Sequence, residues 1–257
     1  MNPSFRSLWI VAFAVLTIAC SEDDPLPLAT VDFKTDPAVV EVGLPVMFDN
    51  LSLNADRYEW QVGTEVLTDI SPEIIFSTPG NFEIVLRAFT KDNQVDSIVK
   101  TVSVKQRYLT DYLVKSFPKD SLDFDWDKDE VLDEDKLPDV LVVISVNKSS
   151  PTAEEIENSV LGPIFLNASN QDVSNTVSNN VILTNESWYI ALSDWDGLDP
   201  DAISLQNDPF SEMVFATFNP VQAPSIKSAD GLAGYFSLTG LDADDNFIDI
   251  DFFFELR

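Results

Sequence analysis

The run Tyr58-Glu59-Trp60-Gln61-Val62 sets aromatic or aliphatic side chains at every second position, and the rest of the chain is interpreted from it. The same period of two recurs in residues 82–88 (Phe-Glu-Ile-Val-Leu-Arg-Ala) and across 97–104. Successive side chains of a strand point to opposite faces, so this alternation indicates strands with one buried face. Short alternating runs between turn residues predict an antiparallel β-sandwich over residues 29–106.

The C-terminal run predicts a second sandwich. Residues 247–256 read Phe-Ile-Asp-Ile-Asp-Phe-Phe-Phe-Glu-Leu, which alternates and then turns continuously apolar, as is typical of a buried strand. The acidic turn before this run joins it to residues 234–238 as a hairpin. Only residues 152–160 favour a helix. The expected fold is therefore all-β, with two antiparallel β-sandwich domains in tandem, at 29–106 and 107–257.

Several segments of the first half resemble a known module. Residues 43–52 (Gly-Leu-Pro-Val-Met-Phe-Asp-Asn-Leu-Ser), 79–86 (Pro-Gly-Asn-Phe-Glu-Ile-Val-Leu) and 100–104 resemble a polycystic-kidney-disease (PKD) domain, together with the opening run. This family has an immunoglobulin-like fold and is common in surface proteins. The resemblance implies a spacer or adhesion role rather than catalysis, and it implies that Trp60 is a core residue and not a ligand platform.

The N-terminus predicts export and lipid anchoring. Residues 8–19 are almost wholly apolar and follow a short segment with one charge, Arg6, as in a secretory signal. The apolar run is well short of the roughly 20 residues that span a bilayer. Cys20, the sole cysteine, follows it directly and is itself followed by Ser-Glu-Asp-Asp. This arrangement resembles the lipobox of bacterial lipoproteins.

The lipobox resemblance implies a signal peptide at 1–19, a lipidated Cys20 that holds the protein on the bilayer, and an acidic tether at 20–28. The acidic residues behind the cysteine resemble the export signal of certain Gram-negative lipoproteins that reach the outer face of the outer membrane. The expected location is therefore the outer membrane, lipid-anchored and facing the extracellular surface.

Composition excludes several kinds of chemistry. The chain has 44 acidic and 15 basic residues, a net charge of −29. Such a charge disfavours nucleic acid as a partner, because the phosphate backbone is also negative. Histidine is absent, and the one thiol is assigned to lipid. Catalysis by Ser-His-Asp or Cys-His groups is therefore excluded, and any metal must be held by oxygen atoms.

Two acidic loops follow from the predicted strands of the second half. One covers residues 120–139 and leads into the apolar strand 140–144; the other covers 194–208 and follows the strand 188–192. Calcium takes six to eight oxygen ligands, which clustered aspartates on adjacent loops supply without histidine or sulfur. The sequence therefore predicts calcium as a bound ion at these loops.

The order of these motifs resembles a C2-type calcium-binding β-sandwich, in which aspartates on two loops at one end hold the ion. The motif matches best at Asp139 in Pro-Asp-Val and at Asp194 and Asp196 in Asp-Trp-Asp. Asp133 lies six positions before Asp139, and Asp208 in Asn-Asp-Pro-Phe matches a later ligand. The resemblance thus implies a metal site formed by these five aspartates.

Other interpretations of the same residues stay open. Asp123, Asp125, Asp127, Asp129 and Glu134 occupy positions 1, 3, 5, 7 and 12 of an EF-hand-like loop, although a lysine stands where that loop requires glycine. Both loops could instead be hydrated connections without an ion. Carboxylate pairs also serve glycoside hydrolysis, but a sandwich of this size usually lacks the deep cleft, so an enzyme is not expected.

Two tryptophans stand beside the acidic loops. Trp126 and Trp195 could stack on a sugar ring, or could anchor the loops to the core. The sequence as a whole predicts a non-enzymatic, lipid-anchored surface protein whose PKD-like spacer presents a calcium-binding C2-like sandwich for adhesion or ligand binding, to a glycan or a surface protein. The alternatives are a carbohydrate-binding component of a surface glycan-uptake system and a purely structural envelope lipoprotein.

Overall fold

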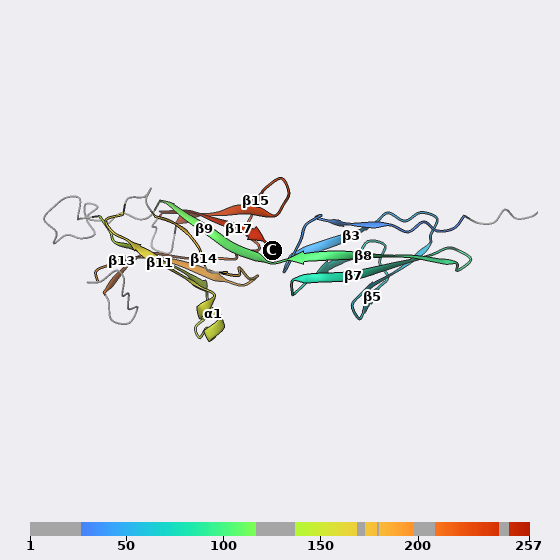
Figure 1. Ribbon diagram of the computed structural model, residues 1–257, viewed down its shortest axis with the longest axis horizontal. Coiled ribbons are helices and arrows are strands. Elements are labelled where there is room, and N and C mark those ends of the chain that lie inside the picture. Colours follow the sequence, from blue (N-terminus) through green and yellow to red (C-terminus); the bar gives the residue numbers. More distant parts are fainter. Residues whose placement is uncertain (1–26, 117–136, 169–172, 179, 198–208, 242–246) are drawn as a thin grey trace, which may run out of the picture.

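The computed structural model describes residues 27–116, 137–168, 173–178, 180–197, 209–241 and 247–257, and these form two pairs of β-sheets that lie end to end along the long axis (Figure 1). The expected all-β fold class is confirmed, since the sheets pair almost entirely antiparallel and the described residues hold one short helix. The exception among the strand pairs is a short parallel pairing of β2 with β8.

The first pair of sheets is built from β1 to β8. Its strands are β1 (Phe33–Asp36), β2 (Val40–Glu41), β3 (Pro45–Asn50), β4 (Arg57–Val62), β5 (Glu65–Leu67), β6 (Glu73–Ile75), β7 (Gly80–Phe89) and β8 (Val95–Lys105). One sheet has the order β1-β3-β6 and the other β2-β8-β7-β4-β5. The two sheets enclose a common core, so this part of the chain is a β-sandwich.

Aromatic side chains fill the centre of this first core. Trp60 is completely buried on β4, which confirms it as a core residue. Phe33 meets the Trp60 ring edge-on at 5.2 Å between centroids, and Phe48 stacks on it at 5.6 Å. The indole Nε1 donates to the carbonyl of Asp69 at 3.0 Å, so the one polar atom of the ring is satisfied inside the core.

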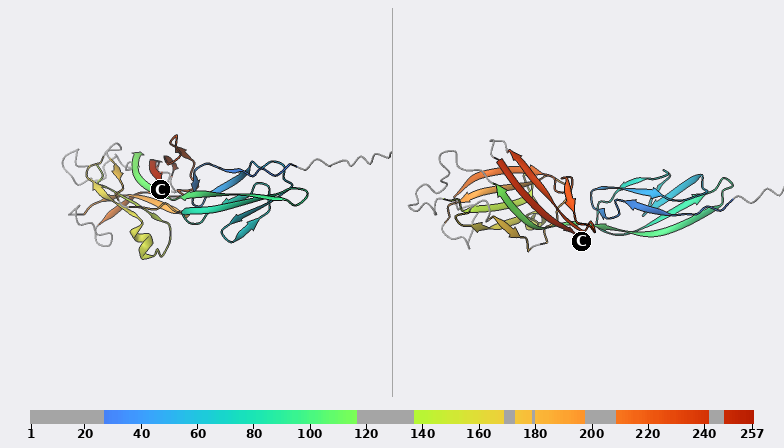
Figure 2. Two further views of the ribbon diagram at one scale, coloured as in Figure 1. Left: turned by 45° about the vertical axis from the view of Figure 1, so that its right-hand side comes forward. Right: turned by 90° about the horizontal axis from the view of Figure 1, so that it is seen from above.

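The second pair of sheets follows after Gln106. Its elements are β9 (Arg107–Ser116), β10 (Val140–Val146), α1 (Ala153–Glu157), β11 (Val160–Phe165), β12 (Ser174–Thr176), β13 (Trp188–Trp195), β14 (Phe210–Phe218), β15 (Ser225–Lys227), β16 (Ala233–Leu241) and β17 (Phe247–Leu256). The sheets have the orders β11-β10-β13-β14 and β12-β9-β17-β16-β15, and they enclose a second core. Figure 2 shows these two layers from a second side.

One local expectation is confirmed in the second sandwich, and another is confirmed with shorter bounds. The predicted hairpin is the antiparallel pair β16 and β17, with Tyr235 opposite Phe253. The predicted helix is shorter than expected: α1 begins after the N-cap residue Thr152, whose hydroxyl accepts from the backbone N–H of Glu155, while Glu155 bonds back to the cap. The helix ends at Glu157 with Asn158 as its C-cap, and β11 begins at Val160.

The direction of the strands fixes which end of the second sandwich faces outward. Val140 of β10 pairs with Asp194 of β13, and Val146 pairs with Trp188 at the other end of the same ladder. The Trp188 end lies nearest the first sandwich, because Asn185 contacts Gly43 there. The Asp194 end therefore points away from the first sandwich, and in Figure 1 it lies opposite the start of the described chain.

Candidate functional site

The described part of the acidic loops lies at this outer end, where the strands bring three of the predicted ligands together. Asp194 is the penultimate residue of β13, and its paired neighbour Val140 directly follows Asp139. The carboxylate of Asp194 accepts from the backbone N–H of Asp139 at 2.9 Å, and Asp194 is only 2% exposed. Asp196 follows on the exposed side. The register of one strand pair thus assembles this acidic corner.

The carboxyl group of Asp139 is partly buried and lies near the charge of Asp196. Its Oδ1 accepts from the backbone N–H of Asn167 at 2.7 Å, while the residue is only partly exposed. Burial raises the pKa of Asp139, the bond from Asn167 opposes that rise, and the nearby charge of Asp196 adds to it. A cation at this corner would relieve the repulsion between Asp139 and Asp196.

The donor atoms of the acidic corner are of the kind that calcium prefers, but there are fewer of them than calcium requires. Asp139, Asp194 and Asp196 offer hard carboxylate oxygens, whereas calcium takes six to eight. One Asp194 oxygen already serves a backbone N–H. Within the described ranges, no group of three acidic, histidine or cysteine side chains is arranged closely enough to hold a metal by itself. Asp194 therefore acts first as a residue that positions the Asp139 backbone.

The remaining predicted site residues lie outside the described residues. These are Cys20, Trp126, Asp133 and Asp208, together with the EF-hand-like run from Asp123 to Glu134. The calcium prediction and the lipid anchor consequently stay predictions.

Of the two interpretations of Trp195, the structure favours the core anchor over the stacking surface. Trp195 is 2% exposed, so its indole has no open face for a sugar ring. A Cβ atom on Gly197 would lie 2.2 Å from the six-membered ring of Trp195, which means that the ring packs directly against this glycine. The tryptophan anchors the chain that leaves β13 at the acidic corner.

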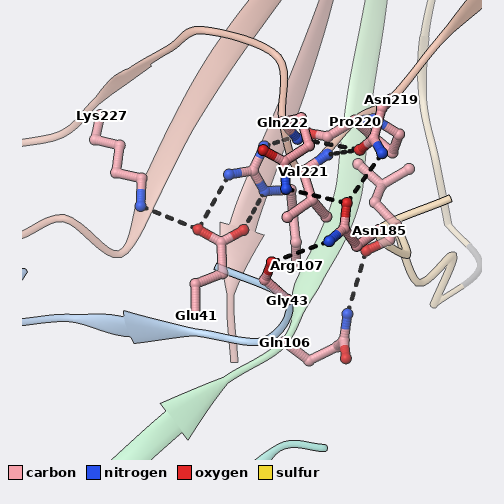
Figure 3. Close-up of polar contacts among 11 residues, drawn as sticks. Glu41, Gly43, Gln106, Arg107, Asn185, Asn219, Pro220, Val221, Gln222 and Lys227 are labelled. Atoms are coloured by element: carbon pink, nitrogen blue, oxygen red, sulfur yellow. Dashed lines mark hydrogen bonds and ion pairs between the residues drawn. The ribbon is translucent and has the colours of Figure 1, made fainter. Parts of the chain in front are cut away.

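The junction between the sandwiches holds a buried charge cluster that the sequence did not predict (Figure 3). Arg107, at the start of β9, and Glu41, on β2, form a two-pronged ion pair, with Nη2 and Oε2 3.0 Å apart and both side chains 1% exposed. Lys227 reaches the same carboxylate at 3.0 Å from β15. Arg107 also donates to the Pro220 carbonyl and lies 3.9 Å from the ring centroid of Phe254.

A second set of contacts surrounds this ion pair. Asn185 donates to the carbonyl of Gly43 at 3.0 Å, and Gly43 adopts a φ of +80° that favours glycine. A Cβ on Gly43 would lie 2.8 Å from the Cβ of Asn185, so the two sandwiches meet closely here. Gln106 and Arg257 exchange two backbone hydrogen bonds at 3.0 Å, which fixes the connecting residue to the C-terminal strand. The junction is therefore a packed interface and not a free linker.

Comparisons with known proteins add little to this geometry. No protein-family model matches the sequence, and no curated protein matches it. One similar solved structure is described as "Structural basis for the promiscuous specificity of the carbohydrate-binding modules from the beta-sandwich super family"; it is 9% identical, has a TM-score of 0.30, and the match covers 91% of this chain and 92% of that chain. The one helix of the described residues, α1, is not long and apolar enough to cross a membrane.

Proposed function

We propose that the protein is a non-enzymatic, lipid-anchored surface protein. The first sandwich is a PKD-like spacer that presents the outer end of the second, C2-like sandwich. Calcium bound at that outer end orders a surface for adhesion or ligand binding. The observation that carries the proposal is the junction: the buried Glu41–Arg107 pair joins the sandwiches end to end. A spacer with a packed junction keeps the acidic corner at a fixed distance from an anchor at the N-terminal end.

The anchor is tested on cells. The wild-type protein should fractionate with membranes and be digested by protease added to intact cells, and Cys20→Ser should leave the membrane fraction because it has no thiol to lipidate. Full protection of the wild-type protein from the protease would contradict surface display. Membrane retention of Cys20→Ser would contradict lipid anchoring.

Calcium at the acidic corner is tested by thermal unfolding. Extracellular calcium modules have dissociation constants of about 0.1–1 mM. At 10 mM calcium, a single site of that affinity stabilises the folded state by about 1.4–2.7 kcal/mol, or roughly 3–10 °C in a domain of this size. Asp196→Asn should remove this shift, while Asp56→Asn, an exposed aspartate of the first sandwich, should keep it. Asp196 is the better target because Asp194 also holds the backbone.

Glycan binding is a second candidate, and a different surface favours it. A shallow pocket of about 470 Å³ opens beside β9 and β12, lined by the ring of Phe253 together with Asp111, Asn175 and Thr176. Tyr235 lies 5.7 Å from Phe253 between ring centroids. An aromatic face with carboxylate, amide and hydroxyl groups around it suits a neutral sugar. A glycan array with Phe253→Ala, and Phe215→Ala on the other sheet as control, tests this candidate; equal binding by both variants and the wild-type protein would reject this pocket.

A further inference from the structure

A groove of about 430 Å³ lies on the first sandwich between β1, at the edge of one sheet, and β8 of the other sheet, and it extends to the junction. Val39 and Val102 contribute apolar surface to it, and Leu232 of the second sandwich closes the junction end. Leu232 is 39% exposed, whereas Val102 is only 7% exposed, so the apolar surface that is open to solvent lies at the junction end of the groove. The groove is distinct from the acidic corner, which lies at the far end of the second sandwich.

The charge of this groove is opposite to that of the protein. Lys34, Lys100 and Lys105 line it, and none of the described residues that line it is acidic, although the chain carries 44 acidic and 15 basic residues. By contrast, four glutamates line the pocket of about 500 Å³ beside α1, namely Glu154, Glu155, Glu157 and Glu186. A concave surface lined by one sign of charge concentrates the field and attracts the opposite sign. The groove is thus suited to a negatively charged ligand.

Lys105 is the lysine whose charge is free for such a ligand. Lys34 pairs with Asp49 at 3.4 Å, and Lys100 pairs with Asp32 at 2.6 Å. In the described residues, no carboxylate lies within ion-pair distance of Lys105. Because the two existing pairs are at least partly exposed, each contributes little to stability and can exchange partners.

The groove also presents an open edge of a β-sheet. On the side of β8 that faces away from β7, β2 pairs only with Val104 and Lys105. The Lys105 carbonyl accepts from the backbone N–H of Val42 on that side. Backbone groups alternate in direction along a strand, so those of Ser103 and Thr101 point the same way as those of Lys105. Among the described strands, none pairs with them there.

We propose that this groove binds an extended acidic segment of a partner protein, which adds to the free edge of β8 as a further strand. Backbone hydrogen bonds to Thr101 and Ser103 would supply affinity, and carboxylates at alternate positions of the partner would meet the lysines. Lysines on an exposed strand also discourage pairing with other strands, because an added strand without acidic residues leaves the lysine charges without counter-charges. An acidic strand matches it, so the same residues that repel most strands select this one.

The proposal is tested with a fluorescent peptide, Val-Asp-Val-Asp-Val-Asp, titrated against the purified protein and followed by anisotropy. Binding should saturate and weaken as salt rises, since the Debye length falls to about 8 Å at 0.15 M. Lys105→Gln should weaken it by about threefold or more, which corresponds to a partly desolvated charge contact. Lys91→Gln, an exposed lysine of the β7–β8 turn, should leave the affinity unchanged. The peptide with asparagine in place of aspartate should bind more weakly.

Hydrogen exchange separates strand addition from simple charge attraction. The bound peptide should slow amide exchange at Thr101 and Ser103, because their N–H groups become hydrogen-bonded. Absence of saturable binding would overturn the proposal, as would binding that is equal in Lys105→Gln and the wild-type protein. If polygalacturonate binds as tightly as the peptide and the two amides stay unprotected in both cases, the groove is a site for anionic polysaccharide and the proposed strand addition is wrong.

Discussion

Replacing Arg107 by methionine should destabilise the protein strongly and separate the unfolding of the two sandwiches. Both members of the Glu41–Arg107 pair are 1% exposed, and removing one partner of such a pair costs about 3–5 kcal/mol. Lys227 still reaches the Glu41 carboxylate at 3.0 Å, so the remaining charge is partly matched. We therefore expect a loss of about 3 kcal/mol in the free energy of unfolding, at the lower end of that range. The methionine side chain should retain part of the contact with Phe254.

The matched control is Arg57→Met. Arg57 is also paired with a glutamate, Glu59, and also lies over a phenylalanine ring, at 3.5 Å from the centroid of Phe89, but it is 49% exposed. Exposed pairs contribute about 0–1 kcal/mol, so this variant should lose less than about 1 kcal/mol. The comparison isolates burial, because the chemical groups removed are alike.

The assay is urea unfolding followed by tryptophan fluorescence, with amide hydrogen exchange to resolve the two halves. Wild-type protein should unfold in one transition, and Arg107→Met in two, with β4 and β13 exchanging at different urea concentrations. Adding Glu41→Gln to Arg107→Met should cost less than the sum of the single changes, because the buried charge left behind is removed. A loss below about 1 kcal/mol, with a single transition retained, would refute the coupling of the sandwiches through this pair.

Two further predictions concern the acidic corner and the junction. Burial and the charge of Asp196 raise the pKa of Asp139, so the ionised carboxylate destabilises the fold at neutral pH. Without calcium, Asp139→Asn should therefore raise the free energy of unfolding by less than about 1 kcal/mol at neutral pH. Thermal melts should show this gain vanishing as the pH falls through the raised pKa, because Asp139 of the wild-type protein is then protonated. A larger gain in stability at acidic pH than at neutral pH would contradict a raised pKa of Asp139. Gly43→Ala should lower the free energy of unfolding, measured in urea, by about 2 kcal/mol or more, because Gly43 has a positive φ and lies against Asn185. The control Gly63→Ala, at a φ of +58° with nothing within 4 Å, should lower it by about 1 kcal/mol. Equal losses would exclude the close contact between Gly43 and Asn185.

The fold class could be predicted because its signals are local. Trp60 and its neighbours alternate, and alternation identifies a buried face without knowledge of any partner strand. The approach of Asp139 to Asp194 was predictable for a related reason. Each residue stands at one end of a strongly apolar strand, and β10 and β13 pair in a register that sets Val140 opposite Asp194.

The junction could not be predicted, because its partners are remote in sequence. Glu41 stands between two valines, as an exposed residue of a strand would, and it is buried only because Arg107 and Lys227 come to it. The sequence left two interpretations open for Trp195, a core anchor or a stacking surface, and could not decide between them for a similar reason. Alternation sets it on the face opposite the buried Asp194, yet its ring packs against Gly197 and is itself buried. Such contacts depend on the path of the chain after the strand has ended.

Calorimetric titration of calcium into the purified protein tests the central claim of the proposed function most directly. Wild-type protein should bind calcium with a dissociation constant of about 0.1–1 mM, as extracellular calcium modules do. Asp56→Asn should bind equally, and Asp196→Asn should show no binding in the same range. Absence of binding by the wild-type protein at 10 mM calcium, or equal binding by Asp196→Asn, would contradict a calcium site at the acidic corner.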